Sequence, residues 1–197
     1  MPSRFDTLTQ AQKDAFNDRV QQLGFDPKAI AGSHIVTGGG GLRIHGAAAE
    51  FANHVKYKTI SSIDELKRLL GVPDAAFKKG TPEHHLKYLP PPTYSAKPAA
   101  TLLALTEPER NDLEAATYAY LFGDSTKVAA WRDTINRLLL PREISFVAVE
   151  NVTVTPSNPL IIKNQSYTFG TVTIEPGGEI IVESDSSVHV QLLVKES

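Results

Sequence analysis

One short phrase occurs twice in the last third of the chain, as VTVTPSNPLII at residues 152–162 and as VTIEPGGEIIV at residues 172–182. Each copy has an alternating apolar run, then a proline followed by residues that favour turns, then a second apolar run. Proline fixes the backbone for the first central position of a turn, and glycine or asparagine tolerates a positive φ at the next position. Each copy therefore predicts a strand, a turn and a second strand.

Two architectures can use such a repeat. In a parallel β-helix the copies stack on one another, whereas in an antiparallel sandwich or jelly-roll each copy folds back as a β-hairpin. A β-helix needs three or more repeats to bury its faces, and only two copies are evident, so the sequence favours hairpins. Residues 144–148 and 188–194 also alternate between apolar and polar side chains, as antiparallel strands with one buried face do. Gly170 interrupts the alternation and predicts a bulge.

The rest of the chain carries helix signals. Thr9 and Gln12 have the spacing of a capping box, and Thr106 begins a second strong start signal. Two helical patterns that are separated by only a few residues predict a helical hairpin over residues 101–140. Trp131, the only tryptophan, is expected in the core of that hairpin.

These patterns predict an α+β fold, with a mostly helical N-terminal portion followed by an antiparallel β-sandwich or jelly-roll-like C-terminal portion. The prolines at 90–92 cannot propagate a helix or a central strand, so they indicate a linker or arm. The predicted organisation is a mixed helix and hairpin region at 1–88, the proline-rich linker at 89–100, the helical hairpin at 101–140 and the β domain at 141–197.

Composition excludes several classes of function. The formal net charge is −2, so no basic excess is present to neutralise a phosphate backbone, and nucleic-acid binding is not expected. No cysteine is present, which excludes disulfides, thiolate metal sites and cysteine nucleophiles. No stretch reaches the roughly 18 apolar residues of a membrane span. The first residues lack the apolar segment of a secretory signal, so we expect a cytoplasmic protein, with signal-independent secretion left open.

The most unusual local sequence is SHIVTGGGGLRIHG at residues 33–46. If the four glycines form the loop of a hairpin, His34 lies opposite His45 and Thr37 lies opposite Leu42. Directly opposed side chains have Cβ atoms about 5 Å apart, so the two imidazoles form a candidate site for a divalent metal. Two histidines supply only half of a zinc site, and a solvated polar hairpin face is the simpler interpretation.

The same segment is a candidate anion site. The amides of Gly39 and Gly40, together with the guanidinium of Arg43, can cradle a phosphate or carboxylate. The loop lacks the Gly-Lys-Ser/Thr ending of a P-loop and the strand-to-helix context of a dinucleotide-binding loop. His189 alternates out of the last apolar stripe and is expected at the surface.

No nucleophile elbow and no pair of facing acids is evident, so the sequence favours a non-catalytic binding or assembly protein. Its β-rich part would contact a protein, a glycan or a second copy of the chain. Association with itself is expected because the last predicted strand carries no Lys, Arg, Asp or Glu before Lys195 to discourage edge pairing. The alternatives are an enzyme with a metal-assisted histidine site at the Gly-rich hairpin, and a small-molecule carrier.

Overall fold

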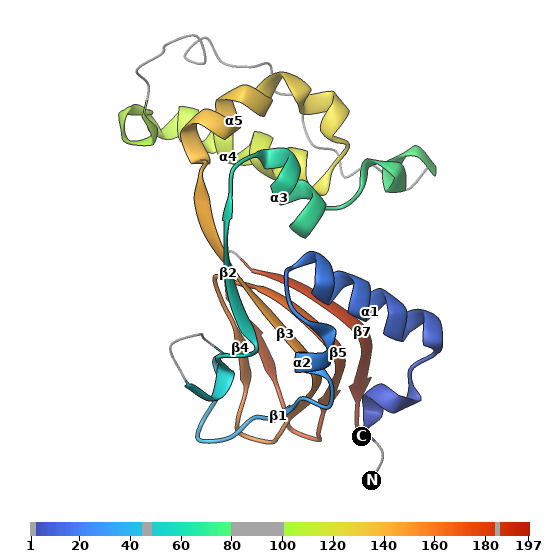
Figure 1. The fold of residues 1–197 in the computed structure, drawn as a ribbon. Helices are drawn as coiled ribbons and strands as arrows, with labels where there is room; N and C mark the ends of the chain where they lie inside the picture. Colours follow the sequence, from blue (N-terminus) through green and yellow to red (C-terminus); the bar gives the residue numbers. More distant parts are fainter. Residues whose placement is uncertain (1–2, 45–48, 80–100, 184–185) are drawn as a thin grey trace. The chain divides into compact units, whose positions relative to one another are not determined.

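The computed structural model describes residues 3–44, 49–79, 101–183 and 186–197. These residues divide into two compact units (Figure 1), one from Met1–Lys58 and Ile144–Ser197 and the other from Thr59–Glu143. The helices are η1 (Arg4–Thr7), α1 (Gln10–Gln22), α2 (Pro27–Ile30), η2 (Ala49–Phe51), α3 (Ile63–Leu70), η3 (Asp74–Lys79), η5 (Leu102–Ala104), α4 (Glu107–Phe122), η6 (Ser125–Trp131) and α5 (Arg132–Leu139). The strands are β1 (His34–Val36), β2 (Val55–Ile60), β3 (Arg142–Val154), β4 (Leu160–Ile162), β5 (Ser166–Ile174), β6 (Ile180–Val182) and β7 (Ser187–Lys195).

The first unit is a coil of stacked parallel strands, not an antiparallel sandwich. The main sheet has the strand order β1-β3-β5-β7, with β2 also paired to β3, and the second sheet consists of β4 and β6. Neighbours along both paths are parallel. The predicted antiparallel β-sandwich or jelly-roll is therefore wrong. The division into a helical N-terminal portion and a β C-terminal portion is also wrong, because β1 joins the main sheet and α4 and α5 lie in the middle of the chain.

The two copies of the repeated phrase stack residue on residue. Val152 pairs in register with Val172, Val154 with Ile174 and Leu160 with Ile180. Each copy thus runs along the main sheet, turns, and continues in the second sheet as one rung of the coil. The hairpin interpretation fails because the two strands of one copy pair with the next copy and not with each other.

The coil has more rungs than the repeat suggested. Residues 34–44 form a first rung, since β1 pairs with β3 and Leu42 bridges to Leu160 of the second sheet. Residues 146–162 and 166–182 form the second and third rungs, and β7 supplies the main-sheet half of a fourth. The stack therefore meets the minimum of three repeats that a β-helix needs.

In β3 and β5, the two middle strands of the main sheet, both faces are largely buried, as is usual for parallel sheets. Apolar side chains such as Val152, Tyr167 and Val172 fill the inside of the coil together with Leu160 and Ile162 from the second sheet. Helix α1 lies along the outer face of the main sheet (Figure 1) and buries Phe16 and Val20. A polar position in this sheet does not mark a face open to solvent, because β5 has four buried polar side chains: Ser166, Thr168, Thr171 and Thr173.

A corner interrupts the main sheet at Gly170. The ladder between β3 and β5 pairs Val149 with Phe169 and then Asn151 with Thr171, so the register is kept but Glu150 and Gly170 do not form a ladder pair. A Cβ atom at Gly170 would lie 2.4 Å from the ring of Phe5 and 2.6 Å from the carbonyl oxygen of Glu150. Gly170 is thus the point where the N-terminal segment docks closely on the sheet.

We expect Gly170→Ala to destabilise the protein by about 1–3 kcal/mol, the usual cost of overpacking. Thermal unfolding followed by circular dichroism should show a lower Tm. Gly38→Ala is the matched control, because a Cβ there meets nothing within 4 Å and the backbone does not have a positive φ. In a Phe5→Ala background the loss should be smaller, since only the clash with Glu150 remains. Equal Tm values for the two glycine variants would contradict the docking contact.

The turns of the repeat lie where the sequence predicts them. Ser157 and Gly177 follow the prolines and have φ values of 62° and 81°. The amide of Asn158 donates to the carbonyl of Thr155 at 3.3 Å, and the amide of Gly178 donates to that of Glu175 at 2.8 Å. The two turns are equivalent, but one of them places an L-residue in the left-handed region.

This difference predicts opposite effects from reciprocal substitutions. Ser157→Gly should stabilise the protein by about 0.5–1 kcal/mol, because relief of left-handed strain exceeds the extra entropy of the unfolded chain. Gly177→Ser should destabilise it by about 1 kcal/mol for the same reason. Urea unfolding of both variants and the wild type measures the differences. A loss of stability in both variants would show that φ does not limit these turns.

The second unit is a helical cluster with its own core. Trp131 is buried there with Leu113, Ile135 and Ile63, which confirms its predicted core position. Helix α4 begins directly after Thr106, as the sequence predicts, and the amide and the hydroxyl of Thr106 donate to the carboxylate of Glu109 at 2.8 and 2.9 Å. The predicted linker at 89–100, including the prolines at 90–92, lies outside the described residues, and the predicted domain boundaries stay a prediction.

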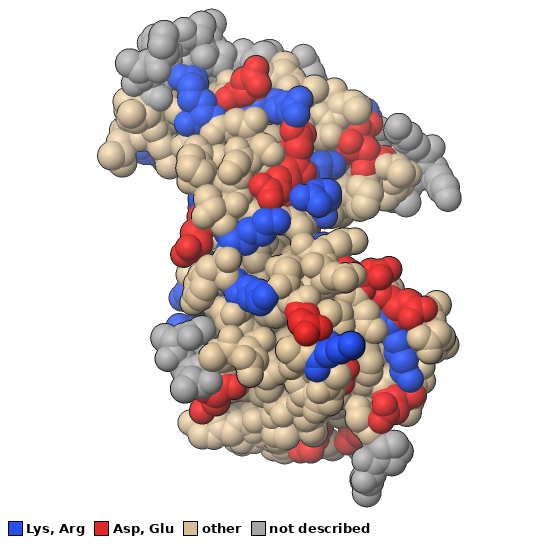
Figure 2. Space-filling view, viewed as in Figure 1, with Lys and Arg blue, Asp and Glu red and all other residues tan. Residues whose placement is uncertain are grey.

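The surface has mixed charge. On the face shown in Figure 2, Lys and Arg side chains lie interspersed with Asp and Glu side chains, in keeping with the formal net charge of −2. Within the described ranges, no helix combines the length and the apolar character that crossing a membrane requires.

Candidate functional site

The Gly-rich segment does not form the predicted hairpin. The amide of Thr37 donates to the carbonyl of Thr153 at 2.9 Å, and the amide of Leu42 donates to that of Pro159 at 2.8 Å. Both flanking strands therefore pair with the second rung and not with each other. The opposition of Thr37 and Leu42 that the hairpin implied is absent for this reason.

The imidazole of His34 lies on the exposed part of β1, with Nε2 2.9 Å from Oγ1 of Thr153. Its predicted partner His45 lies outside the described residues, as do His84 and His85. The metal site at His34 and His45 therefore stays a prediction. Within the residues that the structure describes, no group of three or more His, Cys, Asp or Glu side chains gathers as a metal site would require.

The predicted anion cradle already has internal partners. The amide of Gly40 donates to Oδ1 of Asn158 at 2.8 Å, and the guanidinium of Arg43 lies 3.8 Å from the carboxylate of Glu183. Gly39 and Gly40 have φ values of 65° and 87°, which glycine adopts without strain. An anion at this loop would have to displace Asn158 from the Gly40 amide and Glu183 from Arg43. The positive φ values of Gly39 and Gly40 are explained by the turn itself.

Thr37, Thr155 and Asn158 form a polar staple between the first two rungs. The amide of Thr155 donates to Oγ1 of Thr37 at 2.8 Å, and Oγ1 of Thr155 donates to the carbonyl of Thr37 at 2.9 Å. The side-chain amide of Asn158 donates to Oγ1 of Thr155 at 3.1 Å and thereby connects the staple to the Gly-rich loop. These hydrogen bonds fix the stacking of the two turns. The same polar groups are then already engaged with one another and are less available to a ligand.

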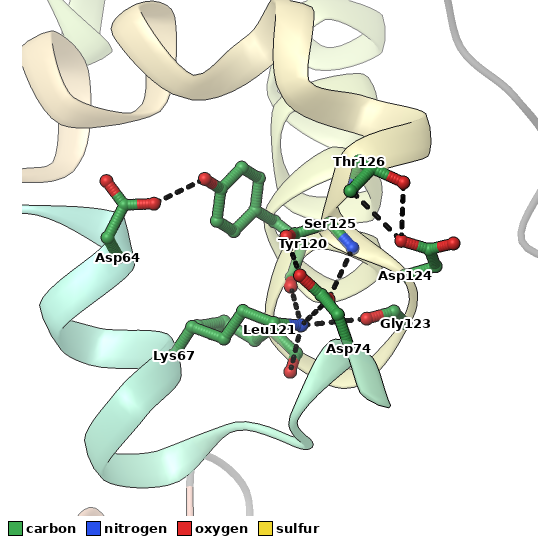
Figure 3. Close-up of polar contacts among 9 residues, drawn as sticks. All are labelled: Asp64, Lys67, Asp74, Tyr120, Leu121, Gly123, Asp124, Ser125 and Thr126. Atoms are coloured by element: carbon green, nitrogen blue, oxygen red, sulfur yellow. Dashed lines mark hydrogen bonds and ion pairs between the residues drawn. The ribbon is translucent and has the colours of Figure 1, made fainter. Parts of the chain in front are cut away.

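A second polar cluster lies in the helical unit around Lys67 (Figure 3). The Lys67 ammonium donates to the carbonyls of Tyr120 and Gly123, each at 2.8 Å, and lies 3.0 Å from Oδ1 of Asp74. Asp74 in turn accepts from the amide of Ser125 at 2.9 Å and from its hydroxyl at 2.7 Å. The sequence reasoning missed this cluster because its members lie far apart along the chain.

Lysine, serine and aspartate also occur in hydrolytic sites, but this geometry is structural. The Ser125 hydroxyl donates to a carboxylate that already holds a cation, so the hydrogen bonds of the described residues give it no free base as a partner. Burial favours a higher pKa for Asp74, but hydrogen bonds from Ser125 and from Lys67 outweigh burial and lower that pKa. The Lys67 side chain lies at the C-terminal end of α4, where its hydrogen bonds satisfy carbonyls that lack helical partners.

Tyr120 extends the cluster toward α3. Its hydroxyl donates to Oδ1 of Asp64 at 2.6 Å, and Asp64 also forms an ion pair with Arg132. Burial, followed by the hydrogen bond to Asp64, raises the pKa of Tyr120 to about 12. The phenol is therefore a fixed donor at neutral pH, and it connects α4 to α3.

Loss of the Lys67 cation should leave Asp74 without its ion pair and the carbonyls of Tyr120 and Gly123 without this donor. We expect Lys67→Met to destabilise the second unit by about 3 kcal/mol, as when one partner of a largely buried pair is removed. Urea unfolding followed by the fluorescence of Trp131 reports on this unit. Arg68→Met, on the exposed face of the same helix, is the matched control and should change stability by less than about 0.5 kcal/mol. Equal midpoints would contradict this role of Lys67.

In the described part of the chain, the end of the coil at β6 and β7 exposes several large apolar side chains. We define the open end as Ile181, Val182, Val188 and Leu193, whose exposed fractions are 41%, 62%, 39% and 57%. Leu193 pairs in register with Val172 and Val188 with Tyr167, both of which are buried inside the coil. The open end is thus largely the continuation of the apolar interior beyond the last complete rung.

The outer side of β7 is covered, unlike its inner side. Nε2 of His189 lies 3.2 Å from the guanidinium of Arg19 on α1, and Gln12 donates to the carbonyl of Gln191 at 3.4 Å. His189 is partly buried, so its predicted surface position is only partly correct. Burial, with the nearby charge of Arg19, lowers the pKa of His189, which favours a neutral imidazole beneath α1.

Comparisons with protein-family models, with curated proteins and with solved structures found no match to this chain.

Proposed function

We propose that this protein is a non-catalytic assembly protein that associates with other copies of itself through the open end of its coil. The observation that carries the proposal is the exposure of interior positions in the last rung. Val172 is 1% exposed, whereas Leu193, the next residue in the same column, is 57% exposed. Burying one such aliphatic side chain contributes about 1.5–3 kcal/mol, so a partner that covers the open end gains from each of these residues.

The backbone of β7 supports the same proposal. In the described part of the chain, β7 ends the strand order and pairs on one side only, with β5. Edge strands are usually protected by charges, prolines, bulges or short length. Strand β7 has nine residues and contains neither proline nor any Asp, Glu, Lys or Arg before Lys195. Its free edge therefore offers hydrogen-bonding groups to an added strand.

A protein partner fits this surface better than a glycan does. The exposed side chains of the open end are aliphatic, and the free edge presents backbone N–H and C=O groups in an extended arrangement. β-Strand addition combines these two kinds of contact, with the main chain providing affinity and the side chains providing specificity.

A charge at the open end should weaken association. We expect sedimentation velocity to show concentration-dependent association of the wild-type protein, and Leu193→Glu to weaken it about tenfold or more, which corresponds to at least about 1.4 kcal/mol. Tyr57→Glu is the matched control, because Tyr57 on β2 is also 57% exposed but lies away from the open end. A wild-type protein that sediments as a monomer at every concentration, and does not differ from Leu193→Glu, would contradict the proposal.

A further inference from the structure

We infer that the partner at the open end is a second copy of this chain, with β7 of each copy pairing antiparallel about a two-fold axis between Gln191 and Leu192. In this register Val190 lies opposite the partner's Leu193, and Val188 lies opposite the partner's Lys195. The inference rests on the proposed function and adds to it the two-fold symmetry and the register.

The directions of the backbone hydrogen bonds favour this register. The amide of Ser187 donates to the carbonyl of Gln165 at 3.2 Å, and the amide of Glu196 donates to that of Ile174 at 2.9 Å, so both residues face β5. Successive residues of a strand face opposite edges. Val188 and Val190 therefore present their N–H and C=O groups to the free edge, and so do Leu193 and Lys195 in the other half of the strand.

The corner makes the two halves of β7 equivalent. The ladder between β5 and β7 pairs Phe169 with Val190 and then Thr171 with Leu192, so Gln191 is skipped. On both sides of this corner, the residues that face the free edge are those whose register partners belong to the core of the coil or pack against it. When β7 is read in the opposite direction from the corner, the same pattern recurs: free-edge residues with inward side chains lie at 188 and 190 on one side and at 193 and 195 on the other.

Because the two halves of β7 are equivalent, a two-fold axis can pair each half with the other half of a second copy. An isologous contact requires residue i to meet j and j to meet i, which holds when 190 pairs with 193 and 188 pairs with 195. Each pair then exchanges both N–H···O=C bonds and places two inward-facing side chains together. A slip of one residue would put an inward-facing side chain beside an outward-facing one, for example Val190 beside the partner's Leu192.

Charge placement is compatible with the same pairing. Lys195 is the charged residue among the four that face the free edge, and the axis places it opposite Val188 of the other copy. Like charges directly opposite one another destabilise a strand pair, and this register avoids that arrangement. Val188, Val190 and Leu193 of the two copies then cover each other's open ends.

The absence of cysteine from the chain allows a direct test. Val188→Cys and Lys195→Cys are prepared separately in the full-length protein, mixed in equal amounts and oxidised. Hydrogen-bonded antiparallel pairs have Cα atoms about 5.5 Å apart, within the range of a disulfide. The mixture should give a covalent dimer on a non-reducing gel. Each variant alone should not, because its two equivalent cysteines lie seven positions apart along the strand pair, roughly 20 Å.

Sedimentation of the wild type and of Leu193→Glu separates this inference from the proposed function. A dimer that is weakened by Leu193→Glu and cross-links in the mixture alone supports both. A dimer that is weakened by Leu193→Glu without cross-linking in the mixture overturns the register and leaves the proposed function standing. Assemblies that keep growing with concentration indicate head-to-tail addition and overturn the two-fold axis. A strict monomer that gives no cross-link overturns both.

Discussion

Register stacking of apolar side chains in parallel rungs holds the first unit together. Ile35, Val152, Val172 and Leu193 form one column through four strands of the main sheet. A residue in such a column is buried by the rungs on either side of it, so burial depends on position in the stack as well as on hydrophobicity. The same rule that makes Val152 and Val172 core residues leaves Leu193 exposed.

The stack also tolerates a large insertion. Residues between the first rung and β3 include the whole helical unit, yet β1 pairs with β3 in continuous register. The entropy of loop closure grows only with the logarithm of loop length, so a loop of roughly a hundred residues costs about 2 kcal/mol more than one of ten. Burial of one or two aliphatic side chains offsets that difference, and the helical unit has its own core around Trp131.

Local features of the fold were predictable because local residues determine them. The turns after Pro156 and Pro176, the start of α4 after Thr106 and the buried Trp131 all follow from neighbouring residues. The strand direction was not predictable in this way, because strand, turn and strand have the same pattern in a hairpin and in a coil.

The first rung is a further copy of the repeat, but its length and its position in the chain hid the similarity. Residues 35–44 read IVTGGGGLRI, one residue shorter between the strand and Leu42 than the later copies, and an insertion separates them from the second rung. Counting this copy would have met the requirement for a β-helix. The Lys67 cluster had no comparable signal, because Asp74 and Ser125 meet only after α3 and α4 have packed.

The outer and inner faces of the main sheet differ in how they are covered, and this difference explains why apolar side chains are exposed at the open end. On the outer side, Phe5 packs on Gly170 and Asn151 accepts hydrogen bonds from the amide of Phe5 and the hydroxyl of Thr171, so the N-terminal segment closes that face. Among the residues that the structure describes, the inner side has no equivalent cover beyond β7. Exposed aliphatic columns next to an unprotected strand edge carry a risk of non-specific association. The proposed pairing would use each free-edge group of β7 once and would place Lys195 opposite the partner's Val188, not opposite the partner's Lys195. Such a pairing would limit association to a closed dimer.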